Sequence, residues 1–196
     1  ANLFDPLELG AIQLPNRIAM APLTRTRSNS DAIPNELMAT YYAQRASAGL
    51  IISEATGISR EGLGWPNAPG LWTDQQVEGW KLVTDAAHRA GGRIVAQLWH
   101  MGRLVHPDLG GGQPVSSSAT TAPDYARTYE GKKPYVTARS VTHADIKRIT
   151  GDYAVAGDVQ KGLFFRGSES LPFGSAIRPV HELIRYLLTG EMPAFA

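Results

Sequence analysis

Cysteine is absent from this 196-residue sequence. Without thiols the chain cannot form disulfides, thiolate metal sites or a cysteine nucleophile, and we expect a reducing compartment, the cytoplasm. An excess of one charge is also absent, because 19 Lys and Arg residues are balanced by 18 Asp and Glu residues. A nucleic-acid-binding surface needs a basic excess, so we expect no nucleic-acid partner.

Long apolar runs are lacking as well. No stretch approaches the roughly 18 residues that span a bilayer, and residues 1–6 lack the basic and apolar regions of a signal peptide. We therefore expect no membrane partner. The five histidines show no metal-ligand spacing, and no phosphate-binding glycine loop occurs. With 43% hydrophobic residues, the chain can still bury a substantial core.

Apolar strands alternate with helices along the first half of the chain. Period-two alternation predicts a hairpin over residues 7–14, and apolar runs predict strands at 18–21, 50–55 and 93–98. Helices are predicted at 35–48, ended by Gly49, and from a cap at Asp74 to about Ala90. Strands that alternate with helices indicate a parallel sheet of βα units.

A polar segment, residues 101–140, follows the third predicted strand. A loop of this length in a compact domain is functional or carries its own hairpin. A helix is predicted next over 144–156, and after it the βα pattern stops. Leu163-Phe164-Phe165 is too short for a strand, while Pro179–Leu188 predicts one amphipathic helix. We therefore separate residues 1–156 from a tail of loop plus one helix, residues 157–196.

Two predicted strand ends carry polar and aromatic groups. A strand is followed by the hydroxyl of Thr24 in the run Arg17-Ile18-Ala19-Met20-Ala21-Pro22-Leu23-Thr24-Arg25. Another strand ends with the Gln97 amide, the Trp99 indole and the His100 imidazole in the run Ile94-Val95-Ala96-Gln97-Leu98-Trp99-His100. The carboxyl ends of parallel strands lie at one edge, so these groups predict a single site. Taken alone, Thr24 also fits an ordinary turn, and His100 also fits a structural role.

Together, residues 3 to about 154 resemble the Old Yellow Enzyme family of flavin-dependent ene-reductases. The matching stretches are Leu3-Phe4-Asp5-Pro6, Leu14-Pro15-Asn16-Arg17-Ile18, Met20-Ala21-Pro22-Leu23-Thr24-Arg25, Tyr41-Tyr42-Ala43-Gln44-Arg45-Ala46, Ile52-Ser53-Glu54-Ala55-Thr56, Asn67-Ala68-Pro69-Gly70-Leu71-Trp72, Gln97-Leu98-Trp99-His100-Met101-Gly102-Arg103 and Pro114-Val115-Ser116-Ser117-Ser118-Ala119. The resemblance implies an α/β fold of the (β/α)8 TIM-barrel type, of which residues 1–156 form the N-terminal part. It also implies FMN, held non-covalently at the carboxyl ends of the strands.

For the reaction, the resemblance implies hydride transfer from NAD(P)H through the flavin to the activated C=C bond of an α,β-unsaturated carbonyl or nitro compound. The substrate would thus be a small-molecule alkene. Thr24 would hydrogen-bond near flavin O4, Ala55 would contact the ring through its backbone, and the Gln97 amide would bond the pyrimidine edge. The implied flavin contacts are Pro22, Leu23, Thr24, Ala55 and Gln97. The implied substrate-side residues are Trp65 and Trp99, although Trp65 fits core packing equally well.

Parts of the family pattern are not found in this sequence. They are the His-x-x-Asn or His-x-x-His pair for the substrate carbonyl, the Tyr proton donor that follows it, and the Gly-rich phosphate grip. No catalytic residue is therefore identified. A complete barrel takes about 250 residues. Two hypotheses remain: an oxidoreductase of this type, intact or completed by homo-oligomerisation, and a truncated or frameshifted non-catalytic remnant.

Overall fold

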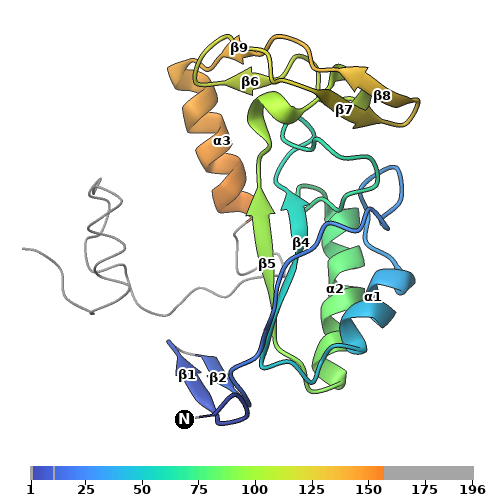
Figure 1. Ribbon diagram of the computed structural model, residues 1–196, viewed down its shortest axis with the longest axis vertical. Coiled ribbons are helices and arrows are strands. Elements are labelled where there is room, and N and C mark those ends of the chain that lie inside the picture. The colour runs from blue at the N-terminus through green and yellow to red at the C-terminus, as the bar shows by residue number, and fades with distance from the viewer. Residues whose placement is uncertain (1, 11, 157–196) are drawn as a thin grey trace, which may run out of the picture. The chain divides into compact units, whose positions relative to one another are not determined.

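Three parallel strands lie at the centre of the part of the chain that the computed structural model describes, residues 2–10 and 12–156 (Figure 1). They are β3 (Ala19–Met20), β4 (Leu50–Gly57) and β5 (Ile94–Trp99), paired in the order β3-β4-β5. Seven of the eight residues of β4 are buried, as expected for a strand covered on both faces. The three predicted strands are confirmed, although β3 is shorter than predicted and β4 and β5 run further toward their carboxyl ends.

The first connecting helix, α1 (Glu36–Ala43), begins at Asn35, whose Oδ1 accepts the N–H groups of the second and third helical residues. The prediction that this helix continues to Ala48 is wrong. After Ala43 the backbone N–H groups of Ala46 and Ala48 bond to carbonyls three residues back, at 3.2 and 3.1 Å. These tighter turns end the α-helix before the chain enters β4.

The second connecting helix, α2 (Asp74–Arg89), begins with a capping box. The Thr73 hydroxyl accepts the N–H of Gln76 at 3.2 Å, and the Gln76 side chain accepts the N–H of Thr73 at 3.2 Å. Thr73 is therefore the N-cap residue, the position predicted for Asp74. Asp74 is instead the first residue of the helix, where its negative charge interacts favourably with the helix dipole. Figure 1 shows α1 and α2 side by side along one face of the sheet.

One apolar core fills the space between the sheet and these helices. Trp80 of α2 is fully buried in it, and its indole N–H donates to the Gly70 carbonyl at 3.1 Å, so burial leaves no polar atom of this ring unsatisfied. The buried members of the core are Met38, Ala39, Tyr42, Ile51, Ile58, Leu71, Trp80, Val83, Ala87, Ile94 and Ala156. The last residue belongs to α3 (His143–Ala156), so the predicted third helix is confirmed.

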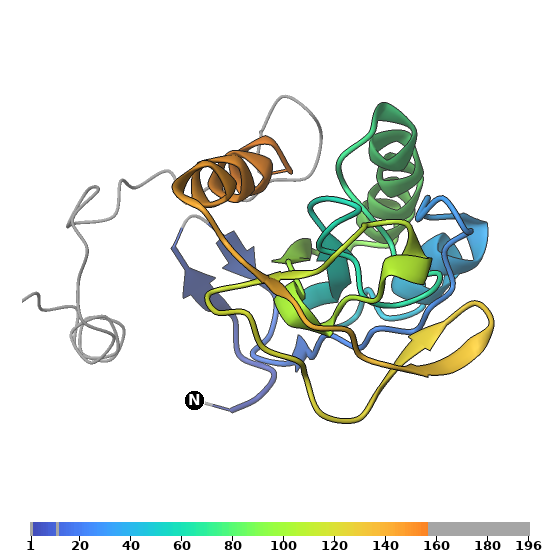
Figure 2. The same cartoon turned by 90° about the horizontal axis from the view of Figure 1, so that it is seen from above.

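Short strands make up the rest of the described chain. β1 (Leu7–Leu9) and β2 (Ile12–Leu14) form the predicted antiparallel hairpin. The long segment after β5 carries a second hairpin, one of the two alternatives predicted, and Figures 1 and 2 show the segment as a whole over the carboxyl ends of β4 and β5. Its elements are η1 (Gly102–Leu104), η2 (Pro107–Leu109), β6 (Val115–Ser116), β7 (Tyr125–Thr128), β8 (Gly131–Pro134) and β9 (Arg139–Ser140), with β6 paired to β9 and β7 to β8.

The described residues thus form an α/β unit of three parallel strands, and no closed barrel is present within residues 2–10 and 12–156. The predictions for Leu163-Phe164-Phe165 and Pro179–Leu188 lie outside the described residues. Of the helices that are described, none combines the length and the apolar character needed to cross a membrane.

Candidate functional site

A β-bulge in β4 decides which side chains reach the candidate site. Ile52 pairs with Val95, but the next pair is Ala55 with Gln97, so three steps on β4 match two on β5. Side chains alternate between the two faces of a strand, and one extra residue exchanges the faces for everything beyond it. Ala55 therefore lies on the same face as Gln97, and Glu54 lies on the opposite face.

Ser53 provides the hydrogen bond that the bulge would otherwise lose. Its hydroxyl accepts the backbone N–H of Gln97 at 3.1 Å and donates to the Glu54 carbonyl at 2.8 Å. The side chain is completely buried, so no solvent could take over either bond. A serine at this position thus stabilises the register that places Ala55 beside Gln97.

On the helix-facing side of the bulge, Glu54 is paired with Tyr42 of α1. The Tyr42 hydroxyl accepts the Glu54 N–H at 2.7 Å and donates to Glu54 Oε1 at 3.3 Å. Burial raises the pKa of the Glu54 carboxyl, and the hydrogen bonds from the Arg25 N–H and from Tyr42 lower it in part. Burial, with the neighbouring Glu54 charge, raises the pKa of the Tyr42 phenol, which keeps its proton for this bond.

The loop after β3, residues 21–25, lies next to this bulge. The backbone N–H of Arg25 donates to Glu54 Oε2 at 3.3 Å, which ties the loop to the residue preceding Ala55. The structure therefore ties the loop after β3 to β4, the strand that lies between β3 and β5. Pro22 and Thr24 are half-buried there, while Leu23 is 63% exposed.

The predicted ring contacts retain free hydrogen-bonding groups. Among the described residues, neither the Thr24 hydroxyl nor the Gln97 amide has a protein partner, and Gln97 is exposed. Two residues further along β5, Trp99 lies on the same face as Gln97, and its indole nitrogen is buried without a partner in the described chain. A buried donor without an acceptor is costly, so it suits a group supplied by a ligand.

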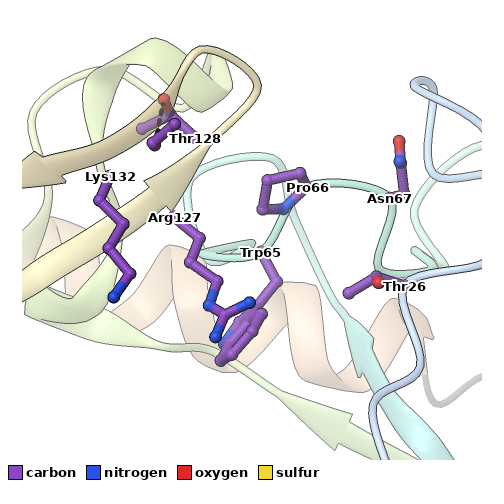
Figure 3. Close-up of a pocket in the computed structure, with 8 residues that line it drawn as sticks. Thr26, Trp65, Pro66, Asn67, Arg127, Thr128 and Lys132 are labelled. Atoms are coloured by element: carbon purple, nitrogen blue, oxygen red, sulfur yellow. Dashed lines mark hydrogen bonds between the residues drawn. The ribbon is translucent and has the colours of Figure 1, made fainter.

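Trp65 lies in the loop that follows β4. It lines a pocket of about 360 Å³ together with Thr26, Arg127 and Lys132, between the loop that follows β3 and the β7–β8 hairpin (Figure 3). The Arg127 guanidinium lies 5.4 Å from the centre of its ring. Neither the predicted ring contacts nor Trp99 lines this pocket.

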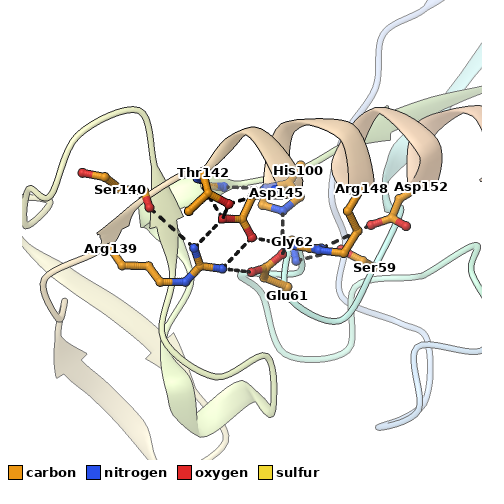
Figure 4. A network of polar contacts seen from close by, with 11 residues as sticks. Ser59, Glu61, Gly62, His100, Arg139, Ser140, Thr142, Asp145, Arg148 and Asp152 are labelled. Atoms are coloured by element: carbon orange, nitrogen blue, oxygen red, sulfur yellow. Dashed lines mark hydrogen bonds and ion pairs between the residues drawn. The ribbon is translucent and has the colours of Figure 1, made fainter.

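An ion-pair network that the sequence did not predict holds the start of α3 against the carboxyl ends of the strands (Figure 4). Glu61, in the loop after β4, contacts Arg148 at 2.6 Å and Arg139 at 3.5 Å. Arg139 also forms two hydrogen bonds to Asp145, at 2.7 and 2.8 Å. The Arg139 guanidinium, the Thr142 N–H and hydroxyl, and Arg148 hold the pKa of the Asp145 carboxyl well below its usual range. The only sequence signal was Asp145 in the first turn of α3.

His100 borders this network at the end of β5. Its Nδ1 accepts the Gly102 N–H at 3.1 Å, so the neutral ring carries its proton on Nε2, which lies 3.8 Å from Glu61. Burial lowers the pKa of the imidazole, and the Glu61 carboxylate opposes this in part. These contacts favour the structural role that the sequence left open. Arg103 similarly anchors a loop, through Thr120 at 2.9 Å.

Residues 2–161 match the family model described as the NADH:flavin oxidoreductase / NADH oxidase family. The chain belongs to this family. The resemblance to Old Yellow Enzyme inferred from the sequence is thereby confirmed. Comparison with curated proteins gives the same result: a flavin oxidoreductase of Emericella nidulans is 44% identical over 162 residues, 79% of this chain and 41% of that protein.

Solved structures of the family are similar in fold as well as in sequence. The old yellow enzyme homologue from Zymomonas mobilis is 59% identical to this chain, with a TM-score of 0.78. The match covers 80% of this chain and 44% of the homologue. Morphinone reductase, in a complex with tetrahydroNAD, is 47% identical to this chain, with a TM-score of 0.75. The match covers 80% of this chain and 45% of morphinone reductase. The chain thus spans less than half the length of these family members. These comparisons do not favour the remnant hypothesis.

Proposed function

We propose that this chain is part of an FMN-dependent oxidoreductase of the Old Yellow Enzyme type, built on a (β/α)8 barrel whose first strands are β3, β4 and β5. FMN, when bound, would supply the redox chemistry, the transfer of hydride from NAD(P)H to the activated C=C bond of an α,β-unsaturated carbonyl or nitro compound. The proposal rests on one observation above all. The bulge at Ser53 sets Ala55 beside Gln97, next to the loop that carries Thr24.

The chemistry of these residues fits a flavin. The Gln97 amide offers both a donor and an acceptor, as the pyrimidine edge requires, and no described residue occupies it. Ala55 has a side chain small enough for a flat ring to approach its backbone. The Thr24 hydroxyl can donate toward developing negative charge on the ring, which favours the reduced form. Pro22 and Leu23 extend the same contact surface beside it.

On the substrate side, we assign Trp99 to the wall of the alkene site. Its buried indole N–H has no acceptor within the described chain and can donate to a ligand. Trp65 and Arg127 line the neighbouring pocket, where a coenzyme or an extended substrate can contact an aromatic face and a cation. The proton donor and the polar pair that hold the substrate carbonyl have no counterpart in the described residues.

The test is the visible absorption spectrum of the full chain after incubation with FMN and removal of free flavin. We expect a bound-flavin band near one per chain, which bleaches when NAD(P)H is added. Gln97→Ala should raise the dissociation constant of FMN about tenfold, as the loss of a well-placed hydrogen bond does. Gln75→Ala, an exposed amide in α2, is the matched control. A wild-type chain that stays colourless would refute the proposal that these residues hold the flavin.

A further inference from the structure

The loop that carries Thr24 is held by a side chain from another strand. Within residues 21–25, the backbone N–H of Arg25 donates to Glu54 Oε2 at 3.3 Å. This nitrogen is bonded directly to the carbonyl carbon of Thr24, and the peptide unit between them is planar. Fixing the N–H therefore fixes the plane of the Thr24 carbonyl and restricts the directions available to its side chain.

Glu54 is itself held rigidly. Its side chain is almost completely buried, at 1% exposure. One carboxylate oxygen accepts the Tyr42 hydroxyl, and the same hydroxyl accepts the Glu54 N–H, so two bonds between one pair of residues set the orientation of the carboxylate. The second oxygen is left directed at the loop. Since both oxygens accept and neither donates, the arrangement suits the ionised carboxylate.

The side chain of Arg25 is fixed independently of its backbone. Its guanidinium carbon lies 3.4 Å from the centre of the Tyr41 ring, and that of Arg45 lies 3.6 Å from the same centre. Two guanidinium groups at these heights cannot share one face, so the ring lies between them. Arg25 is thus held through its backbone by β4 and through its side chain by α1.

We propose that Glu54 is a positioning residue for flavin binding: its buried carboxylate holds the Arg25 N–H and thereby places the Thr24 hydroxyl against the flavin ring. The inference rests on the proposed function. Glu54 lies on the helix-facing side of the bulge and does not itself touch the site. Its effect reaches the flavin through one peptide unit, so it should alter how Thr24 stabilises the reduced ring more than it alters overall folding.

The test compares wild type with Glu54→Gln, which keeps the shape but replaces one acceptor oxygen by a donor amide. Whichever way the amide turns, the Arg25 N–H loses its charged acceptor, because it then faces either the amide nitrogen or a neutral oxygen, to which hydrogen bonds are about half as strong. Tyr42→Phe, which frees the carboxylate and also removes the acceptor of the Glu54 N–H, is the second variant. Glu78→Gln, an exposed carboxylate in α2 with a 69% exposed side chain, is the control. All are studied as the full chain.

Two measurements are needed. In the chain without flavin, amide hydrogen exchange at Arg25 should become about tenfold faster in Glu54→Gln, the factor for losing a charged acceptor. It should also accelerate in Tyr42→Phe, in which the carboxylate is no longer held in one orientation, and stay unchanged in Glu78→Gln. With FMN bound, the midpoint potential of the flavin should shift in both variants, and the dissociation constant should rise, while circular dichroism matches wild type.

The outcomes separate the two proposals. A wild-type chain that binds no FMN refutes the proposed function. If FMN binds and Arg25 exchanges equally fast in wild type and Glu54→Gln, the carboxylate does not hold the loop, and the inference is wrong. It is equally wrong if exchange accelerates while the flavin potential stays at the wild-type value, because Thr24 would then not depend on the loop being fixed.

Discussion

Replacing Ser53 by alanine tests the hydrogen bond on which the bulge in β4 depends. The hydroxyl takes up the N–H of Gln97 and donates to the Glu54 carbonyl, in a position closed to solvent. Leaving an N–H without a partner costs about 1–3 kcal/mol, and losing the second bond removes about 1 kcal/mol. We therefore expect the free energy of unfolding to fall by about 2–4 kcal/mol.

Urea denaturation followed by tryptophan fluorescence measures this loss. With a slope of about 2 kcal/mol per molar urea, the middle of the range for small domains, the midpoint should fall by about 1–2 M. The control is Ser117→Ala, at an exposed position where the change should stay within about 0.5 kcal/mol. Amide exchange at Gln97 should accelerate in Ser53→Ala alone. If Ser53→Ala unfolds at the same urea concentration as Ser117→Ala, the hydroxyl does not support the register and the argument from the bulge fails.

Three further predictions concern the frame of the site. A Cβ at Gly49 would lie 2.0 Å from the Asn16 carbonyl oxygen, so Gly49→Ala should lower the stability by at least about 1–3 kcal/mol. Gly151 lies in open space within α3, so Gly151→Ala should raise the stability by about 0.5–1 kcal/mol. Equal melting temperatures of the two variants would contradict this prediction. Thr73→Ala should cost about 1 kcal/mol through the lost helix cap, and Thr73→Ser should restore most of it in chemical denaturation. The ion pair between Asp145 and Arg139 lowers the pKa of the Asp145 carboxyl in the folded chain. As the pH falls through about 4, the unfolded chain therefore takes up a proton that the folded chain does not, and the free energy of unfolding falls. Asp145→Asn should be less stable at neutral pH and lose less on acidification, while Asp85→Asn, with an exposed side chain, should keep the wild-type pH dependence; a parallel pH profile for Asp145→Asn would rule out this linkage.

The order of elements could be predicted because continuous apolar runs and helix-capping residues are local signals. The end of α1 could not be predicted, because a distant residue determines it. The Asn16 side chain accepts the Gly49 N–H at 2.8 Å and donates to the Ser47 carbonyl at 3.0 Å. This long-range contact favours tight turns over further helix, although the local residues suit either conformation.

The sequence could place the candidate site residues at one edge of the sheet, because the strands that carry them are parallel. It could not show the bulge in β4. A strand buried on both faces shows no alternation, so its sequence cannot reveal that one residue between Ile52 and Ala55 is extra. Likewise, Glu61, Arg139 and Arg148 come from distant segments, and nothing in their spacing indicates that they meet.

The bulge also sets which changes of length β4 can tolerate during evolution. Insertion of one residue between Ile52 and Ala55, with the bulge kept at three steps on β4 to two on β5, would exchange the two faces beyond that point. The acidic side chain of Glu54 would then turn toward the candidate site and the small one of Ala55 toward α1. Among homologues, we therefore expect insertions and deletions to collect in the segment after β5 and to be rare in these four residues.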